Sequence, residues 1–200
     1  MSAGGGPVSR VDAVVVVAGG RSTRFGSDKL QHRLGGRTLL ERTLDAAVGC
    51  GPVVLVTAGE VPAGVDVAVS ENPRWGGPCA AIASALDALS GSGDALILPA
   101  DLADPEAALA ALLCVDEGVL TDQDGAPQWL LARGPIPALQ ARAAELRGAG
   151  ALAGRPARDM LGMLHSRHPA PASACADIDT PADADAAGRI HPKEPAHGTV

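Results

Sequence analysis

Aromatic residues are scarce in this chain of 200 residues, which has two Trp, one Phe and no Tyr. Proteins that bind single-stranded nucleic acid stack the bases on aromatic side chains, so this scarcity disfavours that function. Positive charge is also in deficit, because 16 Lys and Arg stand against 23 Asp and Glu, for a net charge of −7. A protein that binds a long polyanion or an anionic membrane usually has the opposite balance. The composition therefore predicts no nucleic-acid partner and no membrane partner.

Closely spaced cysteines and long hydrophobic runs are absent from the sequence as well. The four cysteines lie at least 29 residues apart (79 − 50), which excludes the paired spacing of a structural zinc site or a redox pair. The apolar run at residues 13–18 is far shorter than the ~20 residues that span a bilayer, and the first ten residues lack the pattern of a signal peptide. We expect buried thiols in a cytoplasmic protein.

Aliphatic residues are plentiful, and their arrangement predicts the fold. Short Val, Leu and Ile runs alternate with Ala- and Leu-rich amphipathic stretches, the pattern of a mostly parallel sheet covered by helices. We therefore predict a single three-layer α/β/α Rossmann-like domain over residues 11–190, with mobile tails at 1–10 and 191–200. The predicted strands are 12–18, 53–57, 66–69, 95–98, 119–121, 128–132 and 174–178. The predicted helices are 38–48, 78–89, 105–113, 136–147, 157–164 and 181–187.

Local signals support several of these boundaries. Thr38 and Glu41 have the spacing of a capping box, in which each side chain satisfies a backbone N–H at the start of a helix. Asp104 stands where an N-cap would precede the helix at 105–113, and Thr180 where one would precede the last helix. The turn-rich residues 122–125 predict an antiparallel hairpin late in the sheet.

The most informative segment is the polar loop that follows the first strand, at residues 18–29. In open α/β sheets, ligands bind beyond the carboxyl ends of the strands, where this loop falls. The paired Gly19 and Gly20 let backbone N–H groups approach a phosphate chain, and Arg21, Arg24 and Lys29 add three cations. The spacing of its glycines fits neither a Walker A loop nor the dinucleotide-binding fingerprint. The loop predicts a site for a short polyanion such as a nucleoside triphosphate.

Residues 17–29 resemble the Leu-Ala-Gly-Gly-x-Ser-x-Arg-Met-Gly-x-Asp-Lys signature of the nucleotidyltransferases related to the molybdenum cofactor guanylyltransferase. Val17 replaces the Leu and Phe25 replaces the Met, and both are apolar exchanges. Residues 34–41, 72–78, 99–102 and 177–181 are similar to further motifs of that family, in the same order. The resemblance covers about residues 12–188 and implies the family's nucleotidyltransferase fold.

The resemblance also implies a reaction. GMP would be transferred from MgGTP to molybdenum-molybdopterin with release of pyrophosphate, giving the guanine dinucleotide form of the cofactor. The implied cofactor is Mg²⁺, the implied substrates are GTP and molybdenum-molybdopterin, and a molybdoenzyme client or an insertion chaperone is a compatible protein partner. Because the acceptor phosphate is already ionised, this reaction needs no general base.

The same resemblance assigns roles to individual residues. Gly19, Gly20 and Arg21 would hold the β and γ phosphates, Lys29 would contact the α-phosphate, and Asp101 would bind Mg²⁺ through a hard carboxylate oxygen. The implied catalytic residues are thus Lys29, Arg21 and Asp101, and the implied metal ligands are Asp101 and Asp179. The implied nucleotide-binding residues are Val17, Ala18, Gly19, Gly20, Arg21, Arg24, Lys29, Asn72, Gly77 and Asp101.

Departures from the family pattern keep several alternatives open. Ala81 and Ala103 replace a Gly and a Pro, and Asp179 replaces an Asn as in some cytidylyl-transferring relatives, while residues 18–20 have the form found in the enzymes that use GTP. A CTP-dependent molybdopterin cytidylyltransferase, a sugar-1-phosphate nucleotidyltransferase and a non-catalytic nucleotide or cofactor carrier are the competing hypotheses. Asp179 and Asn72 are equally explained as strand-end and turn residues. Three arginines are candidates for the acceptor phosphate, and solvated surface positions explain them equally well: Arg133, Arg155 and Arg158.

Overall fold

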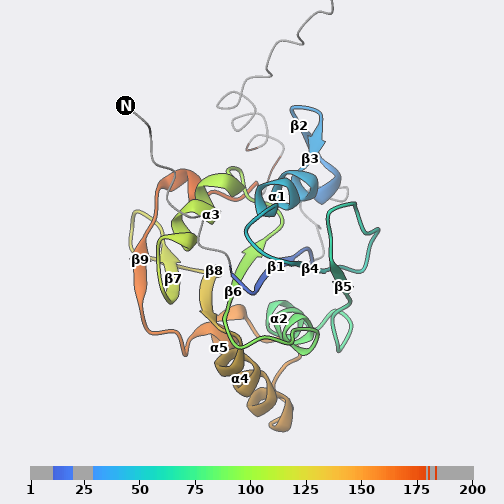
Figure 1. Ribbon diagram of the computed structural model, residues 1–200, viewed down its shortest axis with the longest axis vertical. Helices are drawn as coiled ribbons and strands as arrows, with labels where there is room; N and C mark the ends of the chain where they lie inside the picture. The colour runs from blue at the N-terminus through green and yellow to red at the C-terminus, as the bar shows by residue number, and fades with distance from the viewer. Residues whose placement is uncertain (1–10, 20–28, 179, 181–182, 184–200) are drawn as a thin grey trace, which may run out of the picture.

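A seven-stranded sheet forms the centre of the computed structural model, which describes residues 11–19, 29–178, 180 and 183 (Figure 1). Its strand order is β5-β4-β1-β6-β8-β7-β9, and within it only β8 runs antiparallel to its neighbours. The strands are β1 (Ala13–Val17), β4 (Val53–Val56), β5 (Val67–Val69), β6 (Asp94–Pro99), β7 (Gly118–Thr121), β8 (Pro127–Pro135) and β9 (Arg167–Pro169). The predicted mostly parallel sheet with a late antiparallel hairpin is confirmed.

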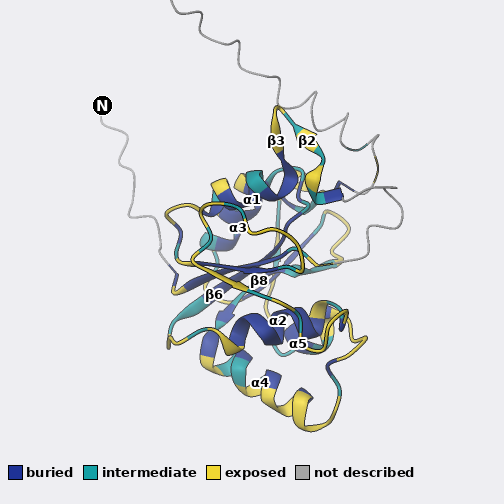
Figure 2. Ribbon diagram, turned by 90° about the vertical axis from the view of Figure 1, so that its right-hand side faces the viewer, coloured by how far each residue is buried: buried dark blue, intermediate teal, exposed yellow. Residues whose placement is uncertain are grey.

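Helices cover both faces of the sheet, as the predicted three-layer fold requires (Figure 2). One face carries α1 (Leu39–Ala47) and α3 (Pro105–Leu113), and the other carries α2 (Pro78–Asp87), α4 (Ile136–Gly148) and α5 (Ala157–Leu161). Two 3-10 turns, η1 (Lys29–Gln31) and η2 (Ala172–Cys175), and a separate hairpin of β2 (Arg33–Leu34) and β3 (Arg37–Thr38) complete the described elements.

The central strand shows why these residues form a buried sheet. Every side chain of β1 is buried, and because successive side chains point to opposite faces, the strand supplies both cores. Val15 and Val17 pack with α2 and α4, whereas Val14 and Val16 pack with α1 and α3. Continuous β-branched sequence is typical of a parallel strand that is covered on both sides.

The predicted helix caps at the start of α1 and α3 are confirmed. The hydroxyl of Thr38 accepts a hydrogen bond from the backbone N–H of Glu41 at 3.1 Å, and the Glu41 carboxylate accepts one from the N–H of Thr38 at 2.7 Å. The backbone bond also holds the pKa of Glu41 below its usual value. Asp104 caps α3 by accepting from the N–H of Ala107.

Three expectations from the sequence are wrong. Residues 174–178 do not form a strand, because Ala174 lies in η2 and only Asp177 makes an isolated bridge, to Leu102. The last strand is instead β9, which pairs in parallel with β7. The predicted helix at 157–164 ends at Leu161. The cysteines are not all buried either, since Cys114 at the end of α3 is exposed. Burial raises the pKa of the Cys50 and Cys79 thiols, as expected for inert core thiols.

Candidate functional site

The site begins where the strand order reverses. The chain runs from β1 outward through β4 and β5, and then returns to place β6 on the other side of β1. The carboxyl ends of β1 and β6 are joined by a hydrogen bond from the Ala100 N–H to the Val17 carbonyl, and Ala18 donates to Val56 at the end of β4. A crevice at such a reversal is the usual ligand site of an open α/β sheet.

Lys29 and Asp101, which are 72 residues apart in sequence, meet at this edge. The Lys29 Nζ lies 2.8 Å from the Asp101 Oδ2, with side-chain exposures of 11% and 27%. Burying a cation is costly unless an opposite charge compensates it, so the Asp101 carboxylate stabilises Lys29 in this largely buried position. The structure therefore brings together the two residues for which the sequence implied contact with the α-phosphate and with the metal.

Helix α1 holds the backbone that carries Asp101. The buried hydroxyl of Thr43 lies 3.4 Å from the Ala100 carbonyl, and an Nη of Arg42 donates to the Ala103 carbonyl at 3.0 Å. From the other side, the N–H of Ile178 donates to the Asp101 carbonyl at 3.0 Å. The turn after β6 is thus fixed on both sides, so the Asp101 carboxylate is positioned before any ligand arrives.

A second carboxylate, Glu71, lies across the start of the glycine loop. A Cβ placed on Gly19 would lie 2.3 Å from the Glu71 Oε1, so any larger residue there would displace the Glu71 carboxylate. The Glu71 Oε2 accepts a hydrogen bond of 3.4 Å from the N–H of Gly77, the residue that precedes α2. Glu71 therefore lies against Gly19 and is hydrogen-bonded to Gly77, two residues that the sequence implied to bind nucleotide. No motif marked Glu71 in the sequence.

Of the other residues predicted to bind nucleotide or metal, some lie in the described part of the chain and some lie outside it. Val17 is buried at the end of β1, and the backbone N–H of Asn72 is held by the Ser84 hydroxyl at 2.9 Å while the Asn72 residue itself is exposed. The predictions for Gly20, Arg21, Arg24 and Asp179 fall outside the described residues.

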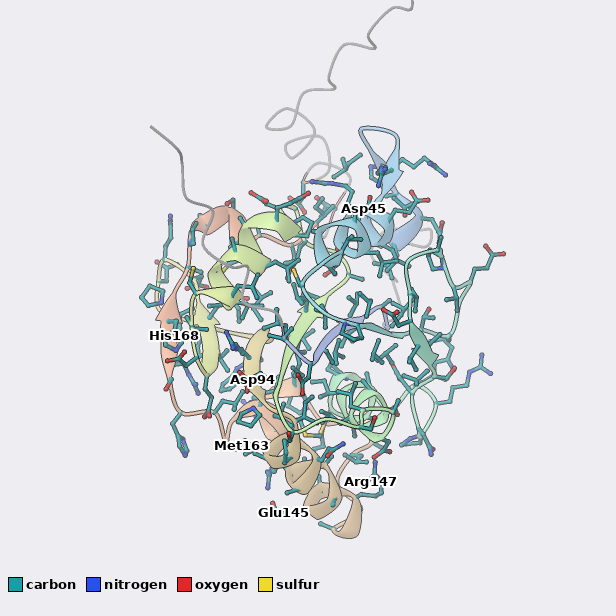
Figure 3. The ribbon with its side chains drawn as sticks, in the orientation of Figure 1. Asp45, Asp94, Glu145, Arg147, Met163 and His168 are labelled. Atoms are coloured by element: carbon teal, nitrogen blue, oxygen red, sulfur yellow. The ribbon has the colours of Figure 1, made fainter. Side chains whose placement is uncertain are left out.

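The three candidate arginines for an acceptor phosphate lie in different places. Arg133 pairs with Asp94, the first residue of β6, at 2.9 Å, and also donates to the Val115 carbonyl. Figure 3 shows Asp94 at the start of β6, the end remote from Asp101. Arg155 lies nearer the site, because its carbonyl accepts from the N–H of Cys79 in the first turn of α2. Arg155 and Arg158 both pair with Asp159.

The side chains at this edge of the sheet suit a cation that takes some of its ligands from the protein and the others from a substrate. Among the described residues, no group of three or more His, Cys, Asp or Glu side chains is placed to hold a metal. Mg²⁺ characteristically takes one or two protein carboxylates together with substrate phosphates, so Asp101 beside a triphosphate fits it.

Fold and site together define an open α/β protein with a charged pair, Lys29 and Asp101, where the strand order of its sheet reverses. The MobA-like NTP transferase domain matches residues 14–167, and the chain belongs to this family. It is therefore a nucleotidyltransferase, and the resemblance that the sequence suggested is confirmed. No helix in the described part of the chain is long and apolar enough to cross a membrane.

Two solved structures share the fold of this chain over nearly its whole length. Molybdopterin-guanine dinucleotide biosynthesis protein A from Archaeoglobus fulgidus is 20% identical, with a TM-score of 0.65, and the match covers 91% of this chain and 100% of that one. 2-C-methyl-D-erythritol 4-phosphate cytidylyltransferase from Thermus thermophilus is 21% identical, with a TM-score of 0.61, over 90% and 98% of the two chains. At these identities the likeness shows the fold alone.

One curated relative is more similar in sequence over a shorter region. The bifunctional protein GlmU from Caulobacter vibrioides is 37% identical over an alignment of 106 residues, and the match covers 46% of this chain. The matched region spans 23% of the relative's own length.

Proposed function

We propose that this protein transfers GMP from MgGTP to molybdenum-molybdopterin and releases pyrophosphate. The observation that carries the proposal is the ion pair between Lys29 and Asp101, which follows the carboxyl end of β6 where Ala100 is hydrogen-bonded to the end of β1. The similar fold of the Archaeoglobus fulgidus protein, whose name specifies a guanine dinucleotide, supports the choice of substrates. Family membership favours a transferase over the non-catalytic carrier.

The residues at this edge match the requirements of nucleotidyl transfer. An acceptor phosphate oxygen attacks the α-phosphorus, the bond to the bridging oxygen breaks, and pyrophosphate leaves with that oxygen. Lys29 donates to the α-phosphate, where negative charge is concentrated in the transition state. Asp101 would hold Mg²⁺, which when bound neutralises charge on the triphosphate. In this proposal Gly19, Gly20 and Arg21 hold the β and γ phosphates, Arg24 also contacts the nucleotide, and Asp179 is a second metal ligand.

In this proposal the base lies against the Glu71 carboxylate, which suits guanine better than cytosine. Guanine presents two adjacent donors, N1–H and the N2 amino group, and a carboxylate can accept from both. Cytosine presents acceptors at N3 and O2 and only the N4 amino group as a donor, so its base edge would face the carboxylate with like partial charges. A site whose polar groups accept hydrogen bonds from the ligand discriminates against a ligand that lacks the matching donors.

A client molybdoenzyme or an insertion chaperone would receive the product.

Base selectivity tests this proposal directly. With Mg²⁺ present, GTP at about 100 times its dissociation constant should stabilise the protein by about 2.7 kcal/mol, a Tm rise of roughly 5–10 °C for a chain of this size. CTP, ATP and UTP should stabilise it less. Equal stabilisation by CTP would contradict the guanine assignment, and stabilisation by none of the four would contradict nucleotide binding at this site.

A substitution at Glu71 makes the same test specific to the base. Glu71→Gln should lower the affinity for GTP by about tenfold, the size of one lost bidentate contact to a base, because an amide N–H would then face the donors of guanine. Glu60→Gln, at an exposed position in the loop after β4, is the matched control and should leave the affinity unchanged. The affinities are measured by calorimetric titration. A Glu71→Gln protein that still prefers GTP as strongly as the wild type would show that Glu71 does not select the base.

A further inference from the structure

The segment between Glu71 and Gly77 holds an exposed tryptophan in an unusual conformation. Trp75 is 52% exposed, although the whole chain has only three aromatic residues. Its φ of +61° makes it the one non-glycine residue in the left-handed region among those that the structure describes. Bulky side chains rarely adopt this conformation, and such strain persists where the surrounding structure imposes it, often at functional sites.

The surrounding turn is pinned at several points, so Trp75 is presented on a fixed support. The N–H of Asn72 donates to the Ser84 hydroxyl at 2.9 Å, and the N–H of Gly76 donates to the Pro73 carbonyl at 2.9 Å. The Gly76 carbonyl accepts from the N–H of Gly154 at 2.8 Å. A Cβ on Gly76 would lie 2.6 Å from the Cβ of Ala80 in α2, so the turn packs directly on that helix.

Position and charge indicate what this tryptophan contacts. Trp75 stands two residues before Gly77, whose N–H donates to Glu71, and hence at the edge of the nucleotide site. The Arg74 guanidinium lies over the Trp75 ring, 5.3 Å from its centre, which places a cation on one face of this half-exposed aromatic side chain. An aromatic ring with a neighbouring cation suits a flat heteroaromatic ligand that also carries phosphate.

The geometry points to Trp75 as a stacking platform for a fused aminopyrimidinone ring at the mouth of this site. Guanine and a pterin share this ring, so the platform serves either the base of the nucleotide or the ring of the acceptor. The inference rests on the proposed function, because that function supplies both rings. A solvent-exposed tryptophan kept for a protein partner is the competing explanation.

Binding and stability measured together on Trp75 variants test the inference. Asn tolerates the left-handed region, so Trp75→Asn should fold with a Tm no lower than that of the wild type. The same variant should bind GTP or 6-hydroxymethylpterin about tenfold more weakly, the scale of one lost base–aromatic stack. Trp75→Phe should keep most of the affinity because it keeps a ring. Trp129→Phe is the control and should bind both ligands normally, because Trp129 lies on β8 with its ring against Arg167 of β9.

The two ligands are titrated separately, by calorimetry for MgGTP and by pterin fluorescence anisotropy for 6-hydroxymethylpterin. A loss confined to one ligand identifies which ring the platform holds. The inference is overturned if Trp75→Asn binds both ligands like the wild type. It is also overturned if the variant binds more weakly but melts at a lower temperature than the wild type, because the loss of binding would then follow from a loss of stability. Trp75-dependent binding of the pterin without any binding of GTP would support the platform and contradict the proposed function. Failure of the wild type to bind either ligand would overturn both.

Discussion

Asp101→Asn is expected to reduce nucleotidyl transfer by about a thousandfold or more, the upper part of the range for removal of one preorganised electrostatic contact. The substitution keeps the size of the side chain but replaces a carboxylate, the kind of ligand that Mg²⁺ prefers, with a neutral amide. It also removes the negative charge that faces the Lys29 Nζ at 2.8 Å. Pyrophosphate release from MgGTP and the molybdopterin acceptor is the rate to measure.

Asp104→Asn is the matched control for this variant. Asp104 lies three residues further along the chain and caps α3, a role that Asn performs equally well. Its substitution removes one carboxylate from the same loop and should leave the transfer rate unchanged. If Asp101→Asn retains near-normal turnover with an unaltered Tm, Asp101 does not bind the metal and the proposed site is wrong.

Lys29→Gln is expected to lower kcat by about a hundredfold to a thousandfold, with a smaller effect on the affinity for GTP. A cation that contacts the α-phosphate acts most strongly where charge develops in the transition state, so its loss should appear mainly in kcat. Arg33→Gln is the control, because the Arg33 guanidinium is exposed and bonds to the Gly36 carbonyl within its own hairpin. The comparison needs steady-state kinetics and an independent measurement of the dissociation constant for GTP.

The two substitutions should not be additive. Lys29 and Asp101 contact each other and would act on the same triphosphate, so the double variant should be about as slow as the slower single variant. Fully multiplicative losses would mean that the two residues act on separate steps. A weaker affinity for GTP with unchanged kcat in Lys29→Gln would place Lys29 in ground-state binding alone.

The fold could be predicted because its main elements have strong local signals. The β1, β4 and β6 strands are mostly continuous aliphatic runs, and α1 begins at a capping box that needs only two residues three positions apart in sequence. The β9 strand could not be predicted in this way. Its sequence is Arg-His-Pro, and it is a strand only because it pairs with β7, which lies far from it in the sequence.

The site was predictable in part for the same reason. Lys29 and Asp101 belong to motifs, so the sequence marked each of them, although it gave no direct evidence that they touch. Glu71 belongs to no recognised motif, and its importance follows only from its approach to Gly19 across a distant part of the chain. The positive φ of Trp75 is likewise a property of the folded turn, since nothing in the run Pro-Arg-Trp-Gly-Gly indicates it.

The most direct test of the account is to identify the product of a single reaction. The purified protein is incubated with MgGTP and molybdenum-molybdopterin, and pyrophosphate and the dinucleotide are measured together by coupled assay and mass spectrometry. We predict that both appear in equal amounts, that CTP does not replace GTP, and that Asp101→Asn forms both products about a thousandfold more slowly. Formation of a cytosine dinucleotide from CTP, or no transfer to molybdopterin by a protein that binds GTP, would contradict the central claim.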